Sequence, residues 1–435
     1  MSATANPIAP PTTSGGSDRS TASSSLSAFT CRFCSRSLRH KVVDLGSAPL
    51  SQSFLSPDQL DSMEPFYPLN VWVCDSCYLV QLNEYVSANE IFEEYAYYSS
   101  FSDAWLRHAA DYVAMITDRL QLDSSSSVVE LASNDGYLLK NFVDAGIPCL
   151  GIEPAANVAV AAVELGVPTD VSFFGSAKAA ELREGGLSAD LVLGNNVLAQ
   201  IPDLNDFVSG ITTILAPQGT ITIEFPHVLQ LIEQNQFDTI YHEHFCYFSL
   251  KSAEAIFAAH GLTIFDVEEL WTHGGSLRIY ARHTTGDDRP VTGAVHQLRA
   301  REQAAGLDDL TTYTRFEKQV RETKRQLLEV LIEAKREGKR IAAYGAPAKG
   351  NTLLNYCGIR EDFIDFAVDR NPYKIGRFLP GTRIPVHHPQ RLDDEQPDLV
   401  LILPWNLTDE IVEQLSHIRA WGGQFIVPIP AAQVI

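Results

Sequence analysis

The sequence has 435 residues, of which 45% are hydrophobic, and its formal net charge is −21 at pH 7. A chain of this length exceeds what one hydrophobic core supports, so two or three domains are expected, and so acidic a balance excludes nucleic acid as the main partner. No apolar run reaches the roughly 20 residues of a membrane span, and the start lacks the layout of a secretory signal, which predicts a cytoplasmic protein without a membrane partner.

Residues 1–28 are rich in Ser, Thr, Ala, Pro and Gly and nearly free of large apolar side chains. Such a segment cannot bury enough apolar surface to offset the entropy of ordering, so we expect a disordered tail. The segment 29–88 follows as short extended pieces around two CxxC pairs. We expect these pieces to form a first, small domain.

The two CxxC pairs predict a structural zinc site. Cys31 and Cys34 form the first pair, and Cys74 and Cys77 form the second. Each pair places two thiols on one tight turn, and four thiolates complete a closed tetrahedral shell. The alternative is a set of reduced, unliganded cysteines or a redox pair. The other cysteines stand among apolar neighbours, where they are expected to pack as small hydrophobic residues in a reducing compartment. They are Cys149, Cys246 and Cys357.

Residues 89–285 predict a second domain in which strands and helices alternate. Apolar strands bridged by helices predict a parallel sheet covered on both faces, and the segment 262–283 is expected to close that sheet as a strand pair. A long charged helix near 310–337 is expected to connect this domain to the next. The alternation then restarts, so residues 286–435 are expected to form a third domain with an open α/β sheet of its own.

The turn after the first strand of the second domain has the composition of a cofactor site. An open parallel sheet binds its ligand at the carboxyl ends of its strands. The candidate residues here are Glu130, Ala132, Asn134, Asp135 and Gly136. Their spacing resembles the first motif of class I methyltransferases, although Ala132 and Asn134 stand where glycines are common. A dinucleotide G-x-G-x-x-G pattern is absent from this turn, which disfavours a nicotinamide cofactor.

Two further strand ends carry polar residues for the same pocket. Glu153 follows the next strand and is placed to accept hydrogen bonds from both ribose hydroxyls of a cofactor. Its alternative role is to begin the following helix, where a carboxylate is favourable. Asn195, Asn196 and Gln200 follow another strand. Their amides are expected to line the cofactor pocket and the reacting centre.

The run at 241–244 places Tyr, His, Glu and His next to one another, just before Ser249, which is expected to cap a helix ending at Gly261. A metal site on His242 and His244 is one alternative, although no third ligand motif lies nearby. A hydrogen-bonded aromatic turn is another. Because all four side chains can handle protons, the run is the leading candidate for the chemistry.

A turn in the third domain is a candidate phosphate site. Gly345, Lys349 and Gly350 stand between a predicted strand and a predicted helix. Backbone N–H groups at a helix N-terminus and one ammonium group suit a nucleotide diphosphate. The alternative is an ordinary helix-starting loop.

Seven segments together resemble the three-domain sugar C-methyltransferases of deoxysugar biosynthesis. They are CRFC, VCDSC, YAYYSSFS, ELASNDG, FDTIYHEHF, GGSLRIYARH and YGAPAKGN. The resemblance implies an α/β protein with a class I methyltransferase doubly wound sheet, a small N-terminal zinc domain and a C-terminal Rossmann-like α/β domain that contributes to substrate binding. It implies S-adenosyl-L-methionine as cofactor, a structural zinc ion and a nucleotide-sugar substrate, typically a dTDP-linked 4-keto-6-deoxyhexose methylated at C3.

The resemblance also assigns roles to residues. It implies His244 as the base, with Glu243 and Tyr241 beside it. The expected substrate contacts are Tyr95 or Tyr97, Gln200, His242 and Lys349. Some family members carry a histidine where this chain has Gln200, so a second imidazole is missing at that position.

These residues predict base-assisted C-methylation. A ketone acidifies the neighbouring C–H, a base removes that proton, and the enediolate carbon attacks the sulfonium methyl; an imidazole near its ordinary pKa suits this step. Two other classes of function were weighed against it. A nicotinamide-dependent nucleotide-sugar oxidoreductase would use YGAPAKG, which lacks the third glycine in register. A non-catalytic zinc-containing binding module leaves the run at 241–244 without a role.

Overall fold

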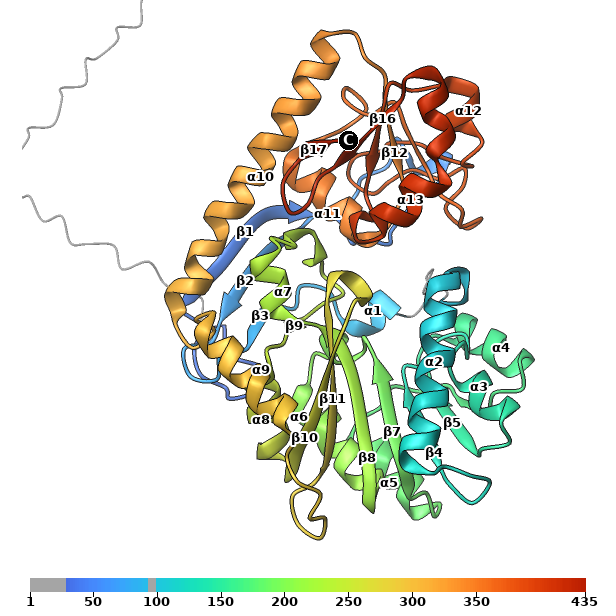
Figure 1. Cartoon of the computed structure of the whole chain (residues 1–435), viewed down its shortest axis with the longest axis vertical. Helices are drawn as coiled ribbons and strands as arrows, with labels where there is room; N and C mark the ends of the chain where they lie inside the picture. The colour runs from blue at the N-terminus through green and yellow to red at the C-terminus, as the bar shows by residue number, and fades with distance from the viewer. Residues whose placement is uncertain (1–28, 93–98) are drawn as a thin grey trace, which may run out of the picture.

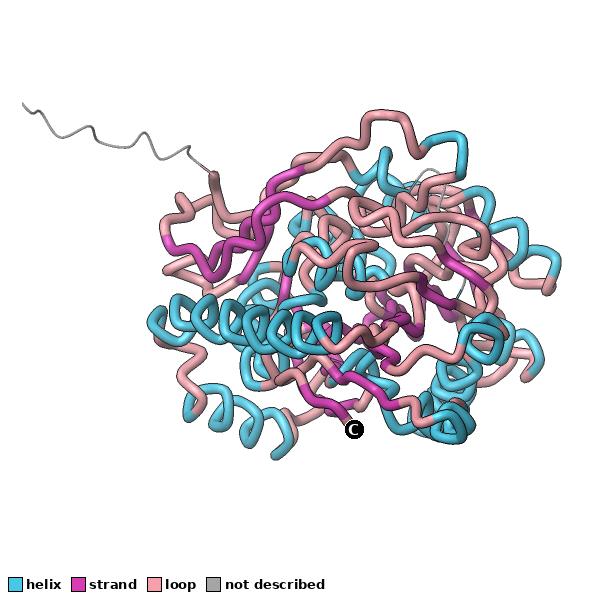
Figure 2. Tube along the Cα trace, turned by 90° about the horizontal axis from the view of Figure 1, so that it is seen from above, coloured by secondary structure: helices cyan, strands magenta, loops and turns pink. Residues whose placement is uncertain are grey.

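The computed structural model describes residues 29–92 and 99–435, so the predicted tail at 1–28 lies outside the described residues. Three separate β-sheets organise the described chain. Figure 1 shows strands β1–β3 between the C-terminal sheet above and the seven-stranded sheet below. The view from above in Figure 2 shows most helices on the outside of the molecule, with strands between them.

The N-terminal sheet has four antiparallel strands in the order β1-β2-β3-β9. Its strands are β1 (His40–Ala48), β2 (Tyr67–Val73), β3 (Val80–Leu82) and β9 (Cys246–Tyr247). The last strand comes from much later in the chain, where Cys246 pairs with Gln81 and Tyr247 pairs with Val80. This pairing brings the turn at 241–244 against the N-terminal sheet.

The central sheet has seven strands in the order β10-β11-β8-β7-β4-β5-β6. They are β4 (Val128–Leu131), β5 (Cys149–Ile152), β6 (Thr169–Asp170), β7 (Ala189–Asn195), β8 (Leu215–Pro226), β10 (Leu262–Leu270) and β11 (Ser276–His283). Strands β4 to β8 pair in parallel, whereas β11 runs antiparallel to its two neighbours. All four residues of β4 are buried, as a parallel strand covered on both faces requires. The predicted doubly wound sheet is confirmed.

Helices cover both faces of this sheet. They are α1 (Ala88–Phe92), α2 (Asp103–Leu120), α3 (Leu139–Asp144), α4 (Ala156–Glu164), α5 (Ser176–Glu184), α6 (Leu204–Ile214) and α8 (Leu250–Ala259). Helix α7 (Val228–Glu233) instead buries its apolar residues in the core that contains the N-terminal sheet. As predicted, the Ser249 side chain caps α8 by accepting the Ser252 N–H. Gly261 follows the end of that helix with a φ of +72°.

The C-terminal sheet has six strands in the order β14-β13-β12-β15-β16-β17, of which β17 alone is antiparallel to its neighbour. Its strands are β12 (Ile341–Tyr344), β13 (Phe366–Val368), β14 (Val386–His387), β15 (Leu399–Ile402), β16 (Gln424–Val427) and β17 (Gln433–Val434). Its helices are α11 (Ala348–Cys357), α12 (Arg391–Glu395) and α13 (Thr408–Gln414). Short 3-10 helices occur at 57–59, 99–101, 198–200, 237–239, 272–274, 405–407 and 416–421.

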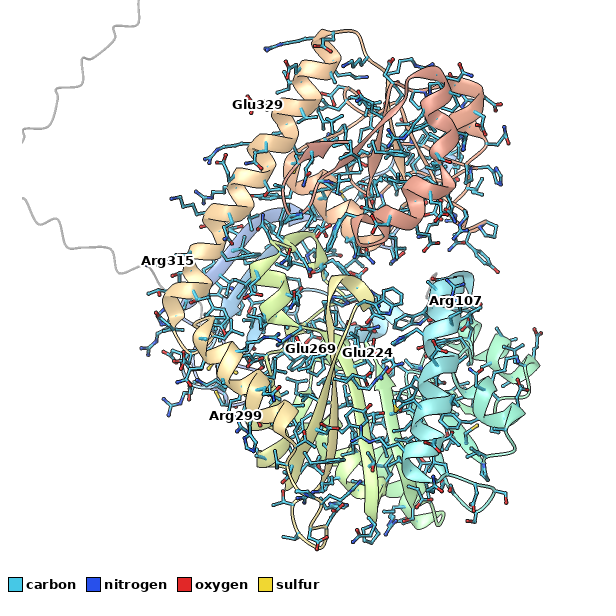
Figure 3. All side chains as sticks on the ribbon, viewed as in Figure 1. Arg107, Glu224, Glu269, Arg299, Arg315 and Glu329 are labelled. Carbon is cyan, nitrogen blue, oxygen red and sulfur yellow. The ribbon has the colours of Figure 1, made fainter. Side chains whose placement is uncertain are left out.

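Two helices join the central and C-terminal sheets. Helix α9 (Gly293–Ala304) is held to α8 and β10 by surface ion pairs, Arg299 with Glu254 and Arg301 with Glu269. Figure 3 labels Arg299 and Glu269, one residue of each pair. Helix α10 (Leu310–Arg336) buries one apolar stripe against β1, as its amphipathic pattern requires. The predicted helix near 310–337 is thus present. None of the helices in the described ranges combines the length and the apolar character that crossing a bilayer demands.

Candidate active site and metal centre

Four thiols gather at the edge of the N-terminal sheet. Cys31 and Cys34 stand before β1, and Cys74 and Cys77 stand between β2 and β3. All four Sγ atoms lie within 4.8 Å of one another, and two of the Sγ–Sγ distances, Cys31 to Cys77 and Cys34 to Cys74, are 3.5 Å. Zinc with Zn–S bonds of about 2.3 Å holds its sulfurs about 3.8 Å apart, so this donor set fits the ion.

The first cysteine turn docks on the central domain through Arg32. Its Nη1 donates to the Pro202 carbonyl at 3.0 Å, and its Nη2 donates to the Leu82 carbonyl at 3.1 Å. Asn205 returns a hydrogen bond from Nδ2 to the Phe33 carbonyl at 3.0 Å. Because Pro202 lines the cavity described next, the metal site is tied to the wall of that cavity.

One cavity lies where the carboxyl ends of the central strands meet the C-terminal domain. Most of the site residues predicted from the sequence line it: Ala132, Asn134, Glu153, Asn195, Asn196, Gln200, Tyr241, Glu243, His244 and Lys349. Six of the predicted cofactor, substrate and phosphate residues do not line it: Glu130, Asp135, Gly136, His242, Gly345 and Gly350. The two tyrosines predicted at the substrate, Tyr95 and Tyr97, lie outside the described residues.

The turn after β4 explains why glycines are common in this motif. Ala132 has a φ of +56°, Asn134 a φ of +50° and Gly136 a φ of +76°. All three occupy the left-handed region that glycine adopts without strain. At Gly136 a Cβ would also come within 3.0 Å of the Ala162 Cβ. The turn thus keeps the glycine conformation where the sequence has Ala and Asn.

Glu153 closes this turn from the end of β5. Its Oε2 accepts the Asn134 N–H at 2.9 Å, and its Oε1 accepts the Ala155 N–H at 2.8 Å, just before α4. Burial raises the pKa of this carboxyl, and the nearby Asp135 adds to the rise. The side chain therefore combines both predicted positions, at the cofactor pocket and at a helix start.

Glu130 and Asp135 lie behind the turn rather than in the cavity. Glu130 is buried in β4, and desolvation together with Glu153 raises its pKa well above the ordinary range. Asp135 accepts the Ser100 N–H at 3.0 Å. Both were expected to contact the cofactor. Their positions fit a role in holding the turn, because both side chains are buried and neither lines the cavity.

The run at 241–244 forms a tight hydrogen-bonded pair at the cavity. The His244 Nδ1 lies 3.2 Å from the Thr239 carbonyl, and the Tyr241 hydroxyl lies 3.0 Å from the His244 Nε2. A carbonyl only accepts, so Nδ1 carries the proton and Nε2 accepts from Tyr241. Burial lowers the pKa of His244 to about 3, which keeps this ring neutral.

Glu243 and His242 point to different surroundings. Glu243 is buried at the cavity, where its Oε1 accepts the Ser51 hydroxyl at 2.8 Å and burial raises its pKa. His242 was expected to contact the substrate, but its Nε2 lies 3.2 Å from the Pro68 carbonyl and its ring packs on Tyr67. In this turn His242 therefore points toward the N-terminal sheet, while Tyr241, Glu243 and His244 line the cavity.

Lys349 reaches the cavity from the first turn of α11. Its Nζ donates to the Asn406 Oδ1 at 2.8 Å, and burial lowers its pKa to about 8. Gly345 and Gly350, predicted beside it, have packing roles: a Cβ would come within 2.6 Å of the Pro404 Cδ at Gly345 and within 2.9 Å of the Leu403 Cβ at Gly350.

Among the cavity residues that the sequence pattern did not indicate are Trp105, His273 and Lys374. Trp105 lies in the first turn of α2, and its ring stacks on that of His108 with the ring centroids 5.0 Å apart. The Lys374 Nζ donates to the Ala346 carbonyl at 2.9 Å, next to α11. The two glycines after His273 were the available signal, because such a pair often marks a close backbone approach.

Comparison with known proteins gives three family matches. Residues 31–92 match the model of a zinc binding domain, residues 105–267 that of a methyltransferase domain, and residues 271–430 that of a C-methyltransferase C-terminal domain. The chain is 36% identical over 405 residues to C-methyltransferase NovU of Streptomyces niveus, which covers 93% of this chain and 96% of NovU. The similarity thus spans all three sheets.

Two solved structures resemble part of the chain. An S-adenosylmethionine-dependent methyltransferase from Clostridium acetobutylicum is 10% identical with a TM-score of 0.33, covering 41% of this chain and 92% of its own. Magnesium protoporphyrin IX methyltransferase from Synechocystis is 14% identical with a TM-score of 0.31, covering 40% of this chain and 78% of its own.

Proposed function

This chain belongs to the family of S-adenosylmethionine-dependent C-methyltransferases that includes NovU, and from this premise we propose that it methylates a carbon of a nucleotide-linked 4-keto-deoxy sugar. The observation that carries the proposal is the cavity shared by Glu153, the Tyr241–His244 turn and Lys349. A carboxylate for the cofactor ribose, a base and a cation for phosphate line one space. A methyl transfer to a phosphorylated sugar needs these three groups together.

The cofactor end of the cavity is assigned to the strand ends of the central sheet. Glu153 keeps further lone pairs for the ribose hydroxyls. Among the described residues, the Asn195 Nδ2 and the Asn196 Oδ1 have no protein partner, which leaves both amides able to bind a ligand. When bound here, S-adenosylmethionine supplies an electrophilic sulfonium methyl group.

Proton removal is assigned to His244. Its neutral ring presents the Nε2 lone pair toward the Tyr241 hydroxyl, so the proton next to the ketone passes to Nε2 directly or through Tyr241. The electrons of the broken C–H bond form an enediolate, whose carbon is the nucleophile for methyl transfer. The negative charge of the enediolate stabilises the imidazolium that forms beside it, which offsets the burial that keeps the free ring neutral.

The remaining polar groups are assigned to the substrate. The Glu243 Oε2 has no partner in the described part of the chain, so it is available to a sugar hydroxyl. At the other end, Lys349, Lys374 and the N-terminus of α11 supply positive charge in an acidic protein. A diphosphate is favourable there because backbone N–H groups and ammonium groups both stabilise an anion.

The test is methylation of a panel of nucleotide keto-sugars by wild type and by His244→Asn. The variant is expected to bind S-adenosylhomocysteine normally and to turn over about 10²–10⁴-fold more slowly, the usual contribution of a general base. With S-adenosylhomocysteine bound, wild type should also exchange the hydrogen next to the ketone for deuterium, and His244→Asn should not.

The control is His260→Asn. His260 is a half-buried histidine outside the cavity, and its Nε2 lies 3.0 Å from the Asn205 Oδ1. This variant should methylate and exchange like wild type. Normal exchange in His244→Asn would show that another residue is the base. If wild type methylates no member of the panel, the proposed nucleotide-sugar substrate is wrong.

A further inference from the structure

His273 lies in the same cavity as His244, on the short helix between β10 and β11. Its φ of +54° and ψ of +15° place it in the left-handed region. A residue with a bulky side chain seldom adopts this conformation, which persists only where its surroundings enforce it. The surroundings of His273 do so on several sides.

The loop that carries His273 is fixed at both ends. Before it, the Thr272 hydroxyl donates to the Glu224 Oε1 at 2.7 Å, and Figure 3 labels Glu224 inside the central domain near α2. After it, Gly274 approaches Trp405 so closely that a Cβ would come within 2.7 Å of that ring. The Gln236 Nε2 also donates to the Gly274 carbonyl at 2.6 Å. The imidazole is therefore held in place by two domains.

The partner of the ring defines its tautomer. The Asn196 Nδ2 lies 2.9 Å from the His273 Nε2, and Asn196 is itself left-handed with a φ of +58°. An amide NH₂ only donates, so Nε2 accepts and the proton of the neutral ring is on Nδ1. Burial lowers the pKa of His273 to about 4, with Lys349 adding to the effect, so the ring is neutral at physiological pH.

The Nδ1–H of His273 is left for a ligand. Among the contacts of the described residues, this nitrogen has no hydrogen-bond partner, and it is not sealed from the cavity. The ring edge is buttressed by Trp105 at 5.2 Å between ring centroids. A fixed, neutral N–H donor inside a cavity that also holds a base is the arrangement that stabilises a developing oxyanion.

We propose that His273 donates a hydrogen bond from Nδ1 to the ketone oxygen of the substrate as the enediolate forms. The inference rests on the proposed function and divides the work between two imidazoles. His244 takes the proton of the broken C–H bond, and the carbonyl electron pair moves onto the oxygen. His273 keeps its own proton and stabilises that negative charge. No further acid, metal or oxidant enters the balance.

The test compares His273→Gly and His273→Asn with wild type. Both replacements tolerate the left-handed conformation. Each is expected to bind S-adenosylhomocysteine normally and to lose about 10²–10³-fold in turnover and in deuterium exchange, the usual effect of removing one oxyanion donor. Added imidazole should restore part of the turnover of His273→Gly, which a purely structural role of the side chain would not allow. The control His260→Asn should behave as wild type.

A second measurement needs no substrate. Nitrogen NMR of histidine-labelled protein, with the signals of His273 identified by their loss in His273→Asn, should show the Nδ1–H tautomer. A ring protonated at Nε2, or full turnover in both His273 variants while wild type methylates, would overturn the inference and leave the proposed function standing. A wild type that neither methylates nor exchanges any keto-sugar would overturn both.

Discussion

Burial sets the protonation of the cavity histidines. It lowers the pKa of His244 to about 3 and that of His273 to about 4, because a charged ring would lose its water there. Each ring has one nitrogen fixed by a neutral partner, the Thr239 carbonyl for His244 and the Asn196 amide for His273. Both rings therefore carry their proton on Nδ1 and are neutral, so the two imidazoles can share one cavity without repelling each other.

The low pKa of His244 predicts a pH-dependent loss of stability. As the pH falls below about 6.5, the unfolded chain binds a proton at this ring and the folded chain does not, so stability is lost from about pH 6.5 downward until the folded ring also titrates near pH 3. Between pH 7.5 and 5.5 this ring should cost about 1.4 kcal/mol. In denaturant unfolding, the loss of unfolding free energy between pH 7.5 and 5.5 should be smaller by that amount in His244→Asn than in wild type. Equal losses in the two proteins would contradict a buried, neutral His244.

Glu153 offers a test of the cofactor wall. Glu153→Ala removes the carboxylate that holds the turn and that we propose to bind the ribose, so S-adenosylhomocysteine affinity should fall by about 1–3 kcal/mol in calorimetry. Glu153→Gln keeps the shape of the side chain, so its affinity for S-adenosylhomocysteine should fall less. Glu164→Ala removes an exposed carboxylate from the end of the adjoining α4 and serves as the control. Affinities that match wild type in both Glu153 variants would remove this residue from the site.

At the scale of elements, the loops before and after β11 each contain a glycine in the left-handed region. Gly274 has a φ of +92°, and a Cβ there would come within 2.7 Å of the Trp405 Cη2. Gly286 has a φ of +82° but has nothing within 4 Å of a Cβ. Both positions need a residue that tolerates a positive φ, but only Gly274 lacks room for a Cβ.

Replacing each of these glycines with alanine separates the two effects. Both variants should lose about 1–2 kcal/mol of unfolding free energy from the left-handed backbone. Gly274→Ala should lose about 1–3 kcal/mol more, because the Cβ pushes against the Trp405 ring, and its turnover should fall because His273 is the next residue. Denaturant unfolding and methylation assays measure both. Equal stability and equal turnover in the two variants would contradict the contact.

The sequence identified those parts of the site that follow from local pattern. The four zinc ligands came from their spacing, and Glu153 came from its place at the end of a strand. His273 was missed because THGGS has the composition of a hairpin turn, and Lys374 was missed because its loop carries no motif. The pairing of β9 with β3 joins segments far apart in the chain, so no local pattern could reveal it. The domain boundaries at 88/89 and 285/286 stay predictions.

At the scale of the whole molecule, segments of the three predicted domains meet at Ser51. The Ser51 hydroxyl, from the N-terminal domain, donates to the Glu243 Oε1 at 2.8 Å. The Ser51 carbonyl accepts the Asn351 Nδ2 from α11 at 2.7 Å. Thr352, next to Asn351, donates from its hydroxyl to the Ile240 carbonyl at 2.9 Å. One loop of the zinc-binding domain thus connects the cavity carboxyl to the C-terminal domain.

Ser51→Ala tests whether this connection supports catalysis. The substitution removes the hydroxyl that donates to Glu243, and a buried carboxyl that loses such a donor costs about 1–3 kcal/mol of stability and has its pKa raised further. If turnover needs ionised Glu243, the acid limb of the kcat profile should move to higher pH, while S-adenosylhomocysteine affinity stays unchanged because the cofactor wall lies on other strands. Ser53→Ala, an exposed serine of the same loop, is the control and should match wild type. A stable Ser51→Ala protein with an unshifted kcat profile would show that Glu243 acts without this support.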